Sequence, residues 1–151
     1  MATPTSSEGI EDHANELRVV VGVDGSECGT RALEFAAHEA TLRGALLHVV
    51  SAYEEAPFVA VWPAVPLEPD QQAAAAVVDE SLAHVREIEP TIVSKGEIRY
   101  GVAGRVLVEA SHGATLLVVG SHGRGRVASV LLGSVSDYCV HHALSSITVV
   151  R

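Results

Sequence analysis

Short runs of β-branched and other apolar residues alternate along this chain with longer segments of helical periodicity, and this order limits the possible folds more than any other feature. The runs that we expect to be strands comprise residues 18–24, 45–52, 92–100, 115–119 and 146–151. The segments that we expect to be helices comprise residues 28–43, 70–87, 102–111 and 134–143. The first apolar run lacks polar alternation, which is typical of parallel strands covered on both faces, and the second is also expected to be a buried strand. The sequence therefore predicts one open, doubly wound, parallel α/β sheet with right-handed crossovers and helices on both faces.

Two of the expected helices carry further local signals. Gly44 follows the helix over residues 28–43 and is the expected residue at its carboxyl-terminal stop. In the helix over residues 70–87, the expected buried stripe consists of Ala75, Val78, Leu82 and Val85.

Residues 120–134 combine three glycines and a serine at the spacing Gly-x2-Gly-x9-Gly-Ser, formed by Gly120, Gly123, Gly133 and Ser134. The stretch follows an apolar run and ends where a helix is expected to begin. Glycine lets the backbone approach an anion closely and adopt positive φ without a Cβ penalty. The unpaired N–H groups and the dipole of the first helical turn attract phosphate. We therefore favour a phosphate-binding loop over a glycine-rich surface loop.

The position of an acidic residue supports the same interpretation. Asp24 ends the first expected strand, and Gly120 follows the fourth. Ligands of doubly wound folds bind beyond the carboxyl ends of the strands, where the strand order reverses. If the first and fourth strands are neighbours, Asp24 and the glycine loop share one crevice.

Length and charge limit the classes of partner. The 151 residues are enough for one domain, and the net charge is −9. Residues 1–98 hold five basic and 17 acidic side chains, whereas residues 99–151 hold five basic and two acidic ones. The acidic total argues against nucleic-acid binding, which needs a basic surface. The basic end suits a phosphorylated small ligand, although a solvated basic face would produce the same asymmetry.

The amino-terminal segment, residues 1–16, is polar and acidic, and it has neither a basic start nor an apolar core. We therefore expect a disordered leader before a domain of residues 17–151, and a cytoplasmic protein. Since no apolar run approaches the roughly 20 residues that a bilayer requires, no membrane span is expected. Cys28 and Cys139 lack metal or disulfide spacing and are expected to be small buried residues.

The segment over residues 53–70 contains four prolines together with several large apolar residues. Proline at these positions excludes regular structure. Long apolar loops in compact domains often serve as lids or contact surfaces.

Signatures of common enzymes are missing. The glycine spacing is neither a Walker motif nor the dinucleotide Gly-x-Gly-x-x-Gly, and no Gly-x-Ser-x-Gly elbow is present. The third expected strand ends near Tyr100, without the aspartate that a phosphotransfer receiver needs. His48 lies within a strand and is expected to be a hydrogen-bonded structural residue. The adjacent His141 and His142 point in different directions on a helix, so they do not suggest a shared metal site.

Three side chains in or beside the glycine loop keep two interpretations open. His122 lies within the loop, where it would either contact a ligand or not. Arg124 and Arg126 would either pair with phosphates or remain solvated.

Four stretches of the sequence together resemble the universal stress protein family. They are residues 21–26 (Val-Gly-Val-Asp-Gly-Ser), 118–123 (Val-Val-Gly-Ser-His-Gly), 131–136 (Leu-Leu-Gly-Ser-Val-Ser) and 147–151 (Ile-Thr-Val-Val-Arg). The resemblance covers residues 17–151 and implies a five-stranded parallel sheet of order 3-2-1-4-5, ATP binding and dimers. Thr115 departs from the family pattern, which usually has an aspartate before the fourth strand; the departure concerns a structural cap rather than the pocket.

The resemblance also implies roles for individual residues. Asp24 would lie against the ribose or help to hold a Mg or Mn ion carried on the phosphates. The adenine pocket would be lined by Gly22 and, through its backbone, Val49. Gly120 and Gly123 would approach the ribose and phosphates, and the outer phosphates would be held by Gly133, Ser134 and Val135.

We therefore expect a cytoplasmic, ATP-binding stress protein that senses or stores ATP rather than turning it over rapidly. The last strand, Ser146 to Arg151, is expected at the sheet edge, where it would form a homodimer about a two-fold axis. Two alternatives remain open: a slow ATPase or phosphotransfer enzyme of the same fold, and a protein-interaction module with a vestigial pocket.

Overall fold

The computed structural model describes residues 17–54, 70–124 and 131–151. The expected leader, residues 55–69 of the apolar loop and Arg126 lie outside this part of the chain. The strands are β1 (Arg18–Gly22), β2 (Leu46–Tyr53), β3 (Ser94–Tyr100), β4 (Leu116–Gly120) and β5 (Ser146–Val150), and the helices are α1 (Glu27–Arg43), α2 (Asp70–Ile88), α3 (Ala103–Ala110) and α4 (Ser134–His142). Every predicted element is present, with ends within two residues of those expected. None of the helices in the described ranges has the length and apolarity that crossing a bilayer would require.

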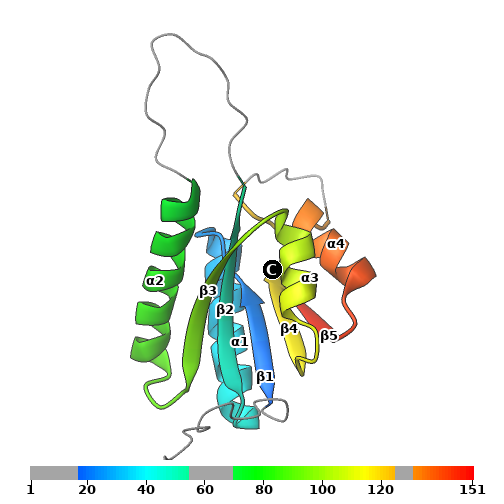
Figure 1. The fold of residues 1–151 in the computed structure, drawn as a ribbon. Coiled ribbons are helices and arrows are strands. Elements are labelled where there is room, and N and C mark those ends of the chain that lie inside the picture. Colours follow the sequence, from blue (N-terminus) through cyan, green and yellow to red (C-terminus); the bar gives the residue numbers. More distant parts are fainter. Residues whose placement is uncertain (1–16, 55–69, 125–130) are drawn as a thin grey trace, which may run out of the picture.

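The sheet is parallel throughout, with the strand order β3-β2-β1-β4-β5, as predicted. β1 lies at its centre, and Val21 pairs with Val49 of β2 on one side and with Val118 of β4 on the other. The order of the strands reverses between β1 and β4. The carboxyl ends of these two strands therefore lie side by side, at the upper end of the sheet in Figure 1.

Helices cover both faces of the sheet, with α1 and α2 on one side and α3 and α4 on the other (Figure 1). Val19 and Val21 of β1 pack in the core beneath α1 and α2, whereas Val20 packs in the core beneath α3 and α4. All three side chains are completely buried. Burial on both faces explains why β1 reads as a continuous apolar run without alternation.

Helix α1 has a defined start and stop. The Ser26 hydroxyl accepts a hydrogen bond from the Gly29 N–H at 3.1 Å and caps the amino terminus, a role that the sequence analysis did not assign. Gly44 lies just past the carboxyl terminus with φ 61°, in the left-handed region that glycine adopts without strain. The predicted stop at Gly44 is confirmed.

The buried stripe of α2 differs in part from the predicted one. Val78 and Val85 are buried as expected, but Ala74 and Ser81 complete the stripe, and Ala75 and Leu82 are only half-buried. The register of α2 is set by contact with β3: Gly96 has no side chain, and its space is taken by Val78 and Leu82. The helical pattern alone carries no information about this tertiary contact.

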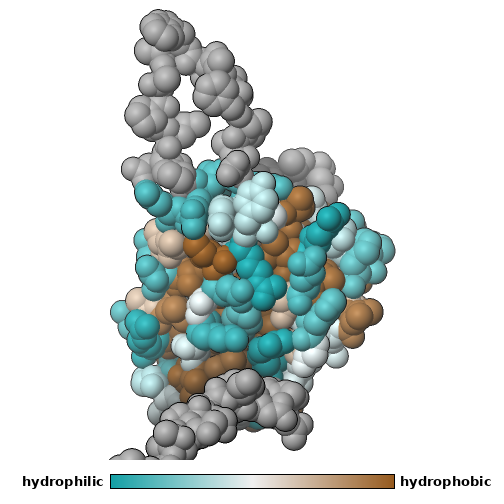
Figure 2. Space-filling view, in the orientation of Figure 1, coloured by the Kyte–Doolittle hydropathy of each residue, from teal (hydrophilic) through white to brown (hydrophobic). Residues whose placement is uncertain are grey.

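The outer face of β2 and β3, between α2 and α3, is polar, and Figure 2 shows hydrophilic residues gathered there. His48 is 2% exposed, and its Nε2 lies 2.8 Å from Oε2 of Glu97, which confirms its predicted structural role. Arg99 donates to the same carboxylate from Nε at 2.6 Å. Burial lowers the pKa of His48 to about 4.

Both cysteines are buried and free, as expected. Burial raises the pKa of the Cys139 thiol to about 11, so this thiol stays protonated and behaves as a small core residue.

Candidate functional site

A cavity of about 130 Å³ lies at the carboxyl ends of β1 and β4, and we call it the β1–β4 crevice. It is lined by Gly22, Val23, Asp24, Ser26, Gly29, Val50, Ala52, Ala103, Leu107, Val119, Gly120, His122, Gly123 and Val135. The lining residues from β2 and α3 are apolar, and Gly120 and Gly123 of the glycine loop also line the cavity. Asp24 and the loop share one crevice, as the sequence predicted.

The turn after β1 holds the Asp24 carboxylate in place. The Val23 N–H donates to the Val50 carbonyl at 3.0 Å and extends the pairing of β1 with β2 by one residue. One carboxylate oxygen, Oδ1 of Asp24, accepts a hydrogen bond from the Ser26 N–H at 2.9 Å. The other, Oδ2, is turned toward the glycine loop, since a Cβ added to Gly123 would lie 2.8 Å from it.

The described glycines of the loop allow close packing against neighbouring segments, and they do not adopt unusual backbone angles. None of Gly120, Gly123 and Gly133 has a positive φ, so the expectation that the loop uses left-handed backbone is wrong for these three. A Cβ on Gly120 would lie 2.9 Å from the Cys28 carbonyl oxygen in α1. β4 and α1 can pack this closely only because Gly120 has no side chain.

The beginning of α4 is anchored to the end of β4. The Gly133 N–H and the Ser136 hydroxyl both donate to the Ser121 carbonyl, at 2.7 and 3.0 Å. Ser134 begins the helix and is exposed, and Val135 lines the crevice. Because the residue before the helix is glycine, no side chain caps the first turn of α4. This turn can therefore offer its N–H groups to an anion at the crevice.

Three of the predicted site residues, Val49, Gly133 and Ser134, are not among the described residues that line the crevice. Val49 was predicted to contribute through its backbone, and its side chain is completely buried in the core beneath α1 and α2. The β2 residues that line the crevice are Val50 and Ala52, which face the other side of the sheet. Because side chains alternate along a strand, Val50 and Ala52 must share one face, but the sequence does not reveal that this face borders the crevice.

The site contains further residues that sequence reasoning missed. Ser26 and Gly29 belong to the start of α1, and Ala103 and Leu107 belong to α3. A serine just before an apolar helical pattern is a capping signal, which could have identified Ser26. Leu107 can pack against β1 because Gly22 has no side chain: a Cβ there would lie 2.5 Å from Leu107 Cδ1.

The two remaining polar candidates in the described residues, His122 and Arg124, lie at different cavities. His122 lines the crevice, and its Nδ1 lies 3.0 Å from the Ser121 hydroxyl. Arg124 does not line the crevice; its guanidinium extends over Gly25 and lines a second cavity on the α2 side. Within the described residues, no group of three or more His, Cys, Asp or Glu side chains could hold a metal ion.

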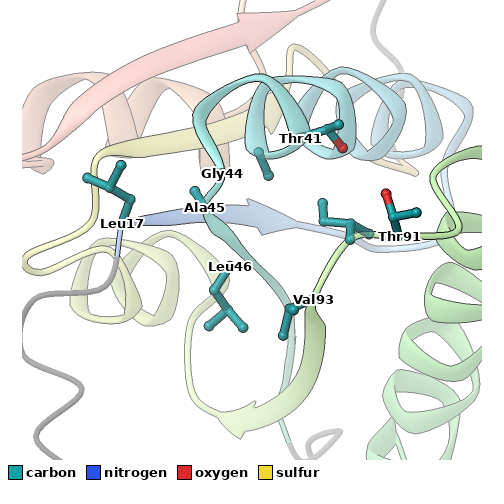
Figure 3. A pocket seen from close by; sticks show the side chains of 9 residues that line it. Leu17, Thr41, Gly44, Ala45, Leu46, Thr91 and Val93 are labelled. Carbon is teal, nitrogen blue, oxygen red and sulfur yellow. The ribbon is translucent and has the colours of Figure 1, made fainter.

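A cavity of about 520 Å³ lies at the opposite, amino-terminal edge of the sheet (Figure 3). Leu17, Leu46 and Val93 form part of its wall, and its only side-chain hydroxyls among the described lining residues are those of Thr41 and Thr91. It offers no charged side chain to a ligand and is not our candidate site.

A model of the universal stress protein family matches residues 17–151, which is the whole chain apart from the first 16 residues. The chain belongs to the universal stress protein family. A curated universal stress protein of Mycolicibacterium smegmatis is 34% identical over 149 residues, which cover 91% of this chain and 49% of the relative. The chain thus spans about half the length of the curated relatives that it matches.

Solved structures of universal stress proteins share the fold. UspA from Lactobacillus plantarum superposes with a TM-score of 0.73 at 23% identity, over 90% of this chain and 98% of that one. A universal stress protein in complex with cAMP superposes with a TM-score of 0.70 at 26% identity, over 90% and 97% of the two chains.

Proposed function

We propose that this protein binds an adenine nucleotide in the β1–β4 crevice, with ATP as the expected ligand. The observation that carries the proposal is the close approach of the Asp24 carboxylate to the backbone of Gly123. The two residues lie where the strand order reverses, which is where doubly wound folds bind ligands. The relative solved in complex with cAMP, at 26% identity, supports the choice of an adenine nucleotide.

Each part of the crevice suits one part of the nucleotide. The apolar lining residues from β2 and α3, which include Val50, Ala52 and Leu107, would contact the base. Asp24 would accept hydrogen bonds from the ribose hydroxyls. The phosphates would follow the glycine loop toward Gly133, Ser134 and Val135, where the uncapped first turn of α4 begins. A divalent cation such as Mg or Mn would arrive on the phosphates, with Asp24 as its nearest protein carboxylate.

A sensing or regulatory role fits this geometry better than rapid turnover. Rapid phosphoryl transfer needs a positioned water, a base and compensation of the charge on the γ-phosphate. Asp24 is the carboxylate that lines the crevice, and it lies at the end of β1 rather than at the start of α4, where the outer phosphates would bind. A cytoplasmic location is part of the same proposal.

We further propose that two copies pair through β5. This strand is the edge of the sheet next to β4, and Ile147, Thr148, Val149 and Val150 are all half-buried. Val140 and Leu144, close to it in sequence, are 43% and 86% exposed. An apolar sheet edge favours pairing with a second chain about a two-fold axis.

The test is titration of the full chain by calorimetry with ATP, cAMP and inorganic tripolyphosphate, together with a hydrolysis assay. We expect both nucleotides to bind more tightly than tripolyphosphate, with little turnover of ATP. If neither nucleotide binds, the protein is instead an interaction module with a vestigial pocket. Turnover at rates typical of enzymes, about 1 per second or more, would indicate an ATPase.

A further inference from the structure

The start of α4 lies directly against the loop that follows β4. A Cβ on Gly133 would lie 3.3 Å from the Ser121 carbonyl oxygen and 3.8 Å from the Gly123 nitrogen. Val135, in the first turn of α4, lines the crevice together with Gly123. The loop after β4 and the start of α4 therefore meet beside the crevice, although they are separate segments of the chain.

A buried hydroxyl joins these two segments. Ser136, also in the first turn of α4, is 1% exposed. Its hydroxyl donates to the carbonyl oxygens of Ser121 and Gly133, each at a distance of 3.0 Å. Ser121 is itself held in place, because its N–H donates to the Val150 carbonyl of β5 at 2.6 Å. Through Ser136, the first turn of α4 is thus attached to the carboxyl end of the sheet.

Neither of the two carbonyls depends on this hydroxyl for a partner. The Ser121 carbonyl also accepts a hydrogen bond from the Gly133 N–H at 2.7 Å, and the Gly133 carbonyl also accepts one from the Asp137 N–H at 2.9 Å. Removing the hydroxyl would therefore leave no buried acceptor unpaired, which is the costly consequence of most such changes. Ser136 is not among the described residues that line the crevice, so its contribution is to hold the turn in position.

We propose that Ser136 is a positioning residue for the outer phosphates of the nucleotide, an inference that rests on the proposed nucleotide site. Its hydroxyl holds the uncapped first turn of α4 where the N–H groups of that turn meet the β- and γ-phosphates. Hydrogen bonds weaken steeply with distance and misalignment, so a turn that can shift binds these phosphates less tightly. The base and the ribose contact other parts of the crevice and do not depend on this turn.

The experiment is calorimetric titration of the wild type and Ser136→Ala with ATP, AMP and inorganic tripolyphosphate. We expect the wild type to bind ATP about tenfold more tightly than AMP. Ser136→Ala should weaken ATP and tripolyphosphate by the same factor, roughly fivefold or more, and should leave the affinity for AMP nearly unchanged. An equal loss for ATP and AMP would show general damage to the crevice and would overturn the proposal.

Ser111→Ala is the matched control. Ser111 is completely buried, and its hydroxyl donates to the Val108 carbonyl at 2.8 Å. It follows the carboxyl-terminal end of α3, where Arg18 from the start of β1 also binds, so it lies away from the carboxyl ends of the strands. Ser111→Ala loses the same kind of hydrogen bond and should retain the ATP affinity of the wild type. A loss of ATP binding equal to that of Ser136→Ala would overturn the assignment.

Gly133→Ala moves the same turn in a different way. The residue has a φ of −71°, which alanine adopts without strain, but the added methyl group would press on the Ser121 carbonyl and on Cα of His122, 3.4 Å away. We therefore expect this variant to fold and to lose affinity for ATP and tripolyphosphate but not for AMP. If Gly133→Ala weakens AMP as much as ATP, the turn does not act on the outer phosphates alone and the proposal is wrong.

The proposal can fail independently of nucleotide binding. A wild type that binds ATP more tightly than AMP, with unchanged ATP affinity in Ser136→Ala, would refute the role of Ser136 alone. A wild type that binds both nucleotides equally would show that α4 does not hold the outer phosphates, and it would also refute this role while leaving the nucleotide site intact. A wild type that binds neither would refute the nucleotide site, and the role of Ser136 with it.

Discussion

The backbone of Gly123 and the carboxylate of Asp24 approach so closely that a single methyl group at Gly123 would lie 2.8 Å from Oδ2 of the acid. The two residues follow β4 and β1, and they are 99 positions apart in the chain. Their contact exists because β1 and β4 are neighbours in the sheet.

Gly123→Val should weaken ATP binding by about 1–3 kcal/mol, the usual cost of forcing a larger side chain into a filled site. This corresponds to a roughly five- to hundred-fold increase in Kd. The valine would displace the Asp24 carboxylate or occupy the space that the phosphates need. Calorimetry with ATP measures the effect, and Ala83→Val on the exposed face of α2 is the control. Unchanged affinity for ATP in the Gly123 variant would contradict the site.

Asp24→Ala should weaken ATP more than tripolyphosphate, because the lost hydrogen bonds go to the sugar. Charge-assisted hydrogen bonds of this kind contribute about 1.5–3 kcal/mol. Asp24→Asn keeps an acceptor for the Ser26 N–H, so comparing the two variants separates the ligand contact from the turn. If the wild type hydrolyses ATP rapidly and Asp24→Ala stops this while binding persists, our regulatory interpretation is wrong.

Disrupting β5 should abolish the dimer. We expect a chain without residues 147–151 to be monomeric or aggregated, since the deletion also uncovers β4. Leu144→Glu, at a position 86% exposed just before β5, is a milder change and should give a folded monomer in light scattering. Leu42→Glu, at an exposed position on α1, is the control and should remain dimeric. A wild-type protein that is monomeric at several hundred micromolar would rule out this interface.

Acidification should destabilise the protein partly through His48. Its pKa is about 4 in the folded protein, chiefly because burial disfavours the charged form, against 6.5 ordinarily. Between these values the unfolded state binds more protons, so the free energy of unfolding decreases as the pH falls from 6.5 to 4. The hydrogen bond from Arg99 lowers the pKa of Glu97. Protonation of Glu97 at still lower pH should therefore decrease the free energy of unfolding further.

Urea denaturation at several pH values measures this slope, to which one proton contributes at most about 1.4 kcal/mol per pH unit. His48→Gln should flatten the slope between pH 4 and 6.5. His84→Gln is the matched control: the His84 ring also contacts a carboxylate, that of Glu34 at 2.8 Å, but lies at the surface. A slope that is the same in wild type and His48→Gln would exclude His48 as a cause.

The local chemistry of the chain was sufficient to predict its elements and their order along the sequence. The short β-branched run at residues 19–21 favours a strand that is buried on both faces, and Gly44 can end α1 because it adopts φ 61° without strain. The serine and glycines of the loop likewise indicated the start of α4. The anion site that they suggest beside Asp24 stays a prediction.

Which face each residue presents was decided by tertiary structure. A continuous apolar run has no polar side, so the sequence could not show that Val50 rather than Val49 lines the crevice, or that α2 buries Ala74 rather than Ala75. These choices depend on strand register and on contacts such as that of Gly96 with Val78. The direction of Arg124 was decided in the same way: the open space over Gly25 lets its guanidinium lie on the α2 side, away from the loop that carries it. Local sequence determines what a segment forms, but the packing of distant segments determines what each side chain meets.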